Sequence, residues 1–82
     1  MGPTAKRIVS TVAERHSLSV NDLIGPSRLA WIVQARQEAM WELRQVVTET
    51  GKPKFSLSHI GSMFGRDHAT VFHACKRHEQ RP

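Results

Sequence analysis

The sequence predicts a small all-α domain with a helix-turn-helix at residues 56–78. Apolar residues recur at helical spacing in every long segment, and no segment shows the strict alternation of a strand. Proline is absent from residues 4–25 and 27–52, which leaves room for uninterrupted helices. The 82 residues are 39% apolar, enough for one small core, so residues 1–82 are expected to form a single domain.

The N-terminal quarter is expected to hold two helices. The first spans about residues 3–17, and proline at its start is typical of a first helical turn. Its apolar stripe comprises Ile8, Val9, Val12 and Ala13. Ser19 with Asp22 three residues later predicts a capping box for a short second helix, which should stop at Gly25 before a proline.

The middle of the chain predicts the longest helix. Its helical period is carried by Ile32, Ala35, Ala39, Met40, Leu43, Val46 and Val47. The period continues to Thr50, so Gly51 is expected to be the residue just after the helix. Trp31 and Trp41 are expected to lie in the core or at its edge, because large aromatic side chains are usually at least partly buried.

The last third contains the predicted helix-turn-helix. Ser56 or Ser58 should cap a short helix that ends at Phe64, and Asp67 should cap a second helix that runs to about His78. Inward positions are Leu57, Ile60, Met63, Phe64, Val71, Ala74 and Cys75, with Phe72 at the border. Outward positions are His68, Ala69, Thr70, His73, Lys76 and Arg77. Such a helix fits the major groove of DNA.

The distribution of charged residues also favours binding of a nucleic acid. Residues 1–51 hold six Lys and Arg against five Asp and Glu, whereas residues 52–82 hold six against two, so the C-terminal third should seek a polyanion. The single cysteine, Cys75, is expected to be a packed thiol in a protein of the reducing cytoplasm. No segment reaches the roughly 18 apolar residues of a membrane span, so no membrane role is expected.

Other classes of site find little support. His73 and Cys75 would point about 200° apart on a helix, which argues against a zinc site. No serine or cysteine nucleophile has a recognisable histidine and acid partner, and so short a chain has little room for an enclosed pocket. We therefore expect no enzyme activity, no metal and no cofactor.

The segment IGSMFGRDHATVFHACKRHEQ, residues 60–80, resembles the signature of a known DNA-binding family. That family is the C-terminal domain, domain IV, of the bacterial replication initiator DnaA, with the approximate pattern I-G-x-x-F-G-G-R-D-H-T-T-V-x-H-A. Upstream, TVAERHSLSVNDLIG and ARQEAMWEL resemble its first helices. The resemblance implies a Trp-repressor-like helical fold that binds double-stranded DNA at DnaA boxes.

The resemblance also implies roles for individual residues. Bases in the major groove would be read by His68, Ala69, Thr70 and His73, and Arg28 would enter the minor groove. Phosphate contacts would come from Arg36, Gln37, Lys54, Arg66, Lys76 and Arg77. Placing Arg36 at a helix start strengthens its assignment, because a cation there opposes the helix dipole and is relieved by phosphate. Asp67 would be a structural helix cap.

The chain departs from the family pattern in ways that affect recognition. One glycine of the G-G-R-D-H turn is missing, and Ala69 replaces threonine. Gln34 and Ala35 replace a basic residue and a proline, and Arg28 is the one basic residue of a loop that is usually richer in them. We expect an altered base preference and weaker minor-groove binding. The chain also lacks the Walker A pattern, so no ATPase domain lies within these residues.

The favoured hypothesis is a monomeric DNA reader of DnaA-box-like sites that acts in replication control or transcriptional regulation, in competition with full-length DnaA. The alternative is a protein-interaction module that binds a replication or transcription regulator through Trp41 and the long helix. The sequence leaves open the exact target, the sign of regulation, the bacterial or phage origin, and whether the chain stands alone or is part of a longer protein.

Overall fold

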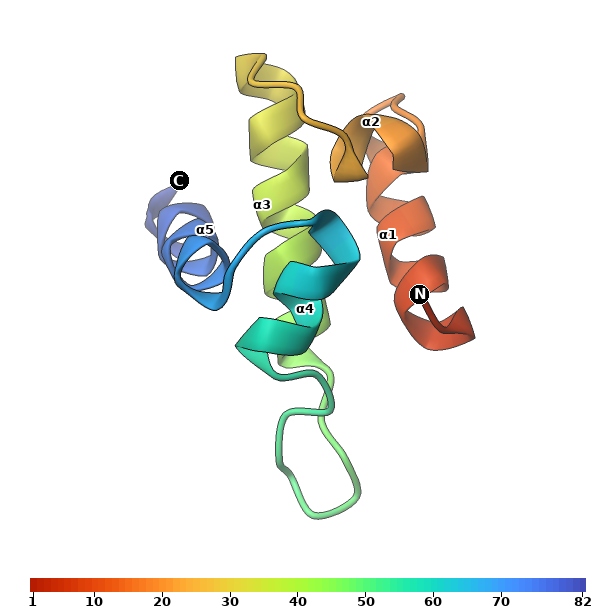
Figure 1. Cartoon of the computed structure of the whole chain (residues 1–82), viewed down its shortest axis with the longest axis vertical. Helices are drawn as coiled ribbons and strands as arrows, with labels where there is room; N and C mark the ends of the chain where they lie inside the picture. Colours follow the sequence, from red (N-terminus) through yellow and green to blue (C-terminus); the bar gives the residue numbers. More distant parts are fainter.

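Five α-helices make up the computed structural model, which describes all 82 residues. Their bounds are α1 Pro3–Arg15, α2 Val20–Ile24, α3 Ala30–Gln45, α4 Leu57–Phe64 and α5 His68–Gln80. Helix α3 runs through the centre, with α1 and α2 on one side, α5 on the other and α4 across it (Figure 1). The all-α prediction is confirmed, and α4 and α5 form the predicted pair of short helices. None of the five helices combines the length and apolar character of a membrane-spanning segment.

The helix starts follow the local capping signals in the sequence. The Ser19 hydroxyl accepts a hydrogen bond from the Asp22 amide at 3.0 Å, and the Asp22 carboxylate accepts one from the Ser19 amide at 2.9 Å. This confirms the predicted capping box of α2. At α4, the Ser56 hydroxyl accepts from the His59 amide at 3.0 Å, so Ser56 is the cap of this helix. Pro3 occupies the first position of α1.

The end of α3 differs from the sequence prediction. The helix ends at Gln45, and Val46 is already extended with a ψ of 124°. The backbone then turns back on itself, so that the Lys54 amide donates to the Val46 carbonyl at 2.8 Å. Gly51, with a φ of +82°, serves this turn rather than the end of a helix. The β-branched run 46–48 explains the break, because such residues favour extended backbone.

The core gathers around α3. Its 14 buried residues are Ala5, Val9, Val12, Ala13, Leu23, Ala35, Ala39, Met40, Leu43, Phe55, Ile60, Phe64, Val71 and Ala74. Most belong to the stripes predicted from the sequence, whereas Phe55 comes from the loop after α3. Because every helix contributes to one continuous cluster, the position of α5 depends on packing across the whole domain.

The two tryptophans have different environments. Trp31 is 61% exposed, so its predicted burial is wrong. It precedes the buried Ile32 in α3, and consecutive residues of a helix point about 100° apart. Trp41 is half-buried, as expected: its indole N–H donates to the Glu79 carboxylate at 3.0 Å, and its ring lies 5.1 Å from that of His78. Trp41 therefore ties α3 to the end of α5.

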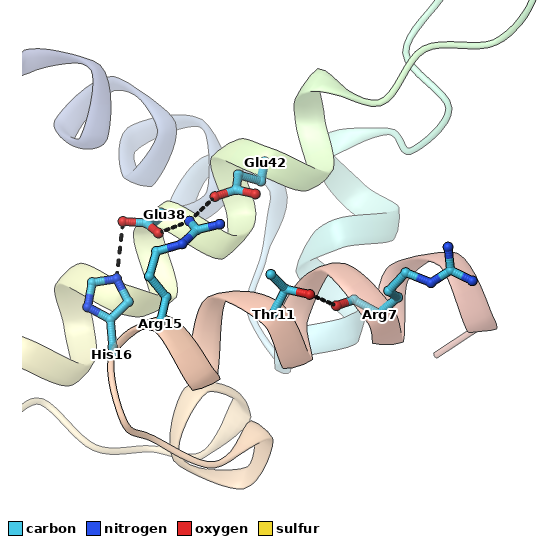
Figure 2. Close-up of polar contacts among 6 residues, drawn as sticks. All are labelled: Arg7, Thr11, Arg15, His16, Glu38 and Glu42. Atoms are coloured by element: carbon cyan, nitrogen blue, oxygen red, sulfur yellow. Dashed lines mark hydrogen bonds and ion pairs between the residues drawn. The ribbon is translucent and has the colours of Figure 1, made fainter.

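A charged cluster joins α1 to α3 on the side away from α5 (Figure 2). One terminal nitrogen of Arg15 pairs with the carboxylates of both Glu38 and Glu42, and His16 lies 3.1 Å from Glu38. Burial alone would raise the pKa of the Glu38 carboxyl, but hydrogen bonds from Arg15 and His16 outweigh it and lower this pKa. The cluster fixes α1 against the helix that carries much of the core.

The corner between α4 and α5 depends on two glycines. Gly65 ends α4 in the left-handed region with a φ of +65°, which glycine adopts without strain. Gly61 allows close approach of the backbone, since a Cβ there would lie 2.3 Å from the Arg66 carbonyl oxygen. The turn between the helices holds only residues 65–67. This tight corner sets the direction of α5.

Candidate nucleic-acid interface

The N-terminus of α5 is fixed by Asp67. Its carboxylate accepts a hydrogen bond from the Thr70 amide at 2.8 Å, as the sequence predicted for a helix cap. This hydrogen bond is the largest cause that lowers the pKa of the Asp67 carboxyl. The cap is therefore charged at neutral pH and also complements the helix dipole.

The predicted reading residues form an exposed ridge along α5. Val71 and Ala74 turn into the core. The exposed side chains of α5 include those of His68, Ala69, Thr70, His73, Lys76 and Arg77, together with Phe72, Glu79 and Gln80. The structure thus brings all four predicted base-reading residues of α5 together in its first two turns, with two cations following them. This arrangement suits a helix whose N-terminal half enters a groove.

Two adjoining hollows lie beside this ridge. One, of about 620 Å³, lies between the α2–α3 loop and the α4–α5 corner, and it includes Arg28. The other, of about 300 Å³, lies between α3 and α5, and it includes His73 and Arg77. Both are lined by Arg36, Arg66 and Thr70. Four arginines and no Asp or Glu line the two hollows, so this concave surface favours an anionic ligand.

The structure corrects the predicted position of Arg36. It lies in the second turn of α3, not at a helix start, and is only 6% exposed. Its guanidinium donates to the carbonyl of Leu23 at 2.6 Å and to those of Gly25 and Ser27 at 3.0 Å each. Burial, and then the nearby charge of Arg66, lower the pKa of the Arg36 guanidinium. Arg36 holds the α2–α3 loop in place, and its buried donors are already occupied.

Arg66, which the sequence predicts to contact phosphate, has a similar internal role in the structure. Its guanidinium donates to the carbonyls of Phe64 at 2.5 Å and Gly25 at 2.8 Å, with a longer contact to Ile24 at 3.4 Å. Gly25 therefore accepts from both Arg36 and Arg66. Through this shared carbonyl, the loop after α2 is bound to both α3 and the α4–α5 corner. Arg66 remains half-buried, at the wall of both hollows.

The other predicted contacts occupy different places. Arg28 is exposed on the α2–α3 loop, at the larger hollow, close to the start of α5. Gln37 lines the smaller hollow, and its side-chain oxygen accepts a hydrogen bond from Arg81 after the end of α5. Lys54 is exposed at the end of the loop after α3 and lines neither hollow. Lys54 is therefore separate from the concave surface.

Two further residues of α5 clarify what the sequence left open. Phe72, placed at the border between inside and outside, is exposed. The helical period is the signal that could have resolved this, because Phe72 follows the buried Val71 directly. Cys75 is half-buried against the core, and burial raises the pKa of its thiol, which makes it a poor nucleophile. No three His, Cys, Asp or Glu side chains gather closely enough to hold a metal ion.

Comparison with known proteins agrees with this geometry. Residues 5–77 match the family described as the bacterial dnaA protein helix-turn-helix. Among curated proteins, the chain is 44% identical over 75 residues to the chromosomal replication initiator protein DnaA of Oenococcus oeni, covering 90% of this chain and 15% of that protein. It is 41% identical over 70 residues to DnaA of Bifidobacterium animalis, covering 84% of this chain and 11% of that protein.

DnaA of Cereibacter sphaeroides is 37% identical over 78 residues, which cover 94% of this chain and 16% of that protein. The chain thus spans only a small part of the length of these initiators. The part that matches is a DNA-binding domain and not a catalytic one. With the capped α5, its exposed ridge and the arginine-lined surface in place, the chain belongs to the bacterial DnaA helix-turn-helix family and is a DNA-binding domain.

Proposed function

We propose that this chain binds duplex DNA sequence-specifically at DnaA-box-like sites. The observation that carries the proposal is the arginine-lined concave surface, free of carboxylates, beside the exposed ridge of α5. In this proposal α5 enters the major groove, where His68 and Thr70 at the start of the helix and His73 one turn later meet base edges. Ala69 is small enough to contact a thymine methyl group.

Arg28 reaches the neighbouring minor groove in the same complex. It lies on the α2–α3 loop, and Arg36 and Arg66 fix that loop to the corner from which α5 starts. One rigid unit therefore carries the groups for both grooves. Because Arg28 is the one cation of this loop, we expect the minor-groove contribution to be modest.

Contacts to phosphate come from exposed cations on the ridge and from one cation apart from it. Lys76 and Arg77 follow the reading residues on α5, and Lys54 lies on the loop before α4. Gln37 offers its side-chain amide from α3. These contacts position the domain and supply most of the affinity, whereas the first turns of α5 supply specificity.

Fluorescence anisotropy tests the proposed specificity. A labelled duplex with a DnaA box and a scrambled duplex of equal composition are titrated with the protein at one salt concentration. We expect the box to bind at least a hundred-fold more tightly, and His68→Ala to lose roughly ten-fold or more of this preference. His16→Ala, on the opposite side of α3, is the matched control and should keep it. Equal binding of both duplexes by the wild type would refute DnaA-box recognition.

The proposed biological role is competition for sites that a full-length DnaA also uses, in replication control or transcriptional regulation, with the chain acting as a monomer. The chain carries a reading helix but no Walker A pattern, so these 82 residues can contribute by occupying a DNA site. In a footprint of full-length DnaA on a box array, we expect added wild-type chain to displace the initiator and His68→Ala to displace it poorly. Sedimentation should give one copy per box.

A further inference from the structure

Phe72 is the one large apolar side chain exposed on α5. It is 46% exposed, although a phenylalanine on a small domain usually finds cover in the core. The core side of α5 is already filled by Val71 and Ala74, each at most 6% exposed. Phe72 lies in the second turn of the helix, next to His73 and one turn after His68 and Ala69. Its ring therefore stands beside the reading residues.

Polar neighbours frame this ring on the exposed side. The Lys76 ammonium lies 5.5 Å from the ring centroid, and the His73 ring meets it edge-on with centroids 5.5 Å apart. A hollow of about 300 Å³ lies on the other flank of α5, and its lining consists of Phe72, Lys76, Glu79, Arg44, Leu57 and Cys75. The ring is thus flanked by Lys76 and His73 on its exposed side, at the edge of a hollow whose lining mixes apolar, cationic and acidic side chains. That setting suits a nucleic acid better than the apolar surface of a protein partner.

We propose that Phe72 determines specificity by packing against the 5-methyl group of a thymine in the major groove. The inference rests on the proposed entry of α5 into that groove. Thymine offers the one apolar group among the major-groove edges, and phenylalanine is one of the side chains that contact it. Lys76, four residues later on the same side of α5, reaches the adjacent phosphate and keeps the ring at the groove wall.

Selection from a random duplex pool tests the inference whatever the target sequence is. Wild type, Phe72→Ala and Val47→Ala are each used to enrich bound duplexes. Val47 is 57% exposed and lies on the loop after α3, so it is a control for loss of an exposed apolar side chain. We expect wild type and Val47→Ala to select a thymine at a position where Phe72→Ala accepts any base. Urea denaturation should show all three equally folded.

A methyl deletion in the DNA then identifies the contact. Replacing that thymine by deoxyuridine removes only the methyl group and should weaken wild-type binding about four-fold, the equivalent of one buried methyl. The same replacement should leave binding by Phe72→Ala unchanged. Equal penalties in both proteins, or identical selected sequences, would overturn the role of Phe72 and leave DNA recognition standing. A wild-type selection without any consensus would overturn both, and a consensus unlike the DnaA box would refute the proposed target alone.

Discussion

At the scale of single residues, the arginines divide into two groups that composition cannot distinguish. Arg36 and Arg66 point into the protein and donate to backbone carbonyls, whereas Arg28 and Arg77 are exposed to solvent. Charge and position in the family pattern predict phosphate contacts for Arg36, Arg66 and Arg77. Neither criterion indicates that a backbone carbonyl of another segment lies close to Arg36 or Arg66. The buried guanidinium of Arg36 is part of the fold, because without it the carbonyls of Leu23 and Ser27 lose their donor and that of Gly25 keeps only Arg66.

Removing the Arg36 side chain should therefore destabilise the domain. We expect Arg36→Ala to lose about 3 kcal/mol of unfolding free energy, since the carbonyls of Leu23, Gly25 and Ser27 lose a charged donor. Urea denaturation followed by circular dichroism measures this. Arg77→Ala is the control: its exposed side chain should change stability by no more than about 0.5 kcal/mol while weakening DNA binding. Equal stability of both variants would contradict the internal role of Arg36.

At the scale of elements, helix starts marked by a side-chain cap were predictable, whereas the uncapped start of α3 and its end were not. The caps at Ser19 and Asp67 were predictable, and Ser56 was one of two serines predicted to cap α4, because a cap is a contact within three residues. The prediction that α3 continues to Thr50 is wrong because the apolar period continues through Val46 into the loop. There, backbone pairing between Val46 and Lys54 replaces the helix. The sequence also did not predict contacts between helices, such as the ion pair of Arg15 in α1 with Glu38 in α3.

That pairing predicts how stability depends on pH. Because the pKa of Glu38 is lowered in the folded chain, its contribution is present above the ordinary glutamate pKa of about 4.3 and disappears as the pH falls through the lower folded value. We expect Glu38→Gln to cost up to about 1 kcal/mol at pH 7 and less at about pH 3, below the ordinary glutamate pKa. Urea denaturation at both pH values measures the difference. Glu14→Gln, at an exposed residue of α1 outside the cluster, should match wild type throughout.

At the scale of the whole molecule, the acidic side chains of α3 and the arginines beside α5 lie on different sides of α3. The carboxylates of Glu38 and Glu42 face α1, while the charged residues that line the hollow between α3 and α5 are all arginines. The sequence located the excess charge in the last third and so anticipated the reading helix. It could not anticipate that Arg28, far away in the chain, lines a hollow together with Thr70, because packing of α2 and α4 against α3 brings them together.

This arrangement predicts the salt dependence of DNA binding. Of the six cations predicted to contact DNA, four are exposed, namely Arg28, Lys54, Lys76 and Arg77, while Arg36 and Arg66 donate to backbone carbonyls. Each phosphate that a protein cation neutralises contributes about −0.9 to the slope of log K against log salt, so we expect about −3.6. Anisotropy titrations from about 50 to 200 mM salt measure this slope.

Single substitutions separate the interface from the rest of the surface in the same titrations. Arg77→Ala should make the slope shallower by about 0.9, because one counterion fewer is released on binding. Arg7→Ala is the matched control, since Arg7 extends into solvent from α1, far from α5 (Figure 2). Its slope should equal that of the wild type. If both variants make the slope shallower by the same amount, DNA binds by net charge alone. A wild-type slope steeper than about −5 would mean that Arg36 and Arg66 also contact phosphate.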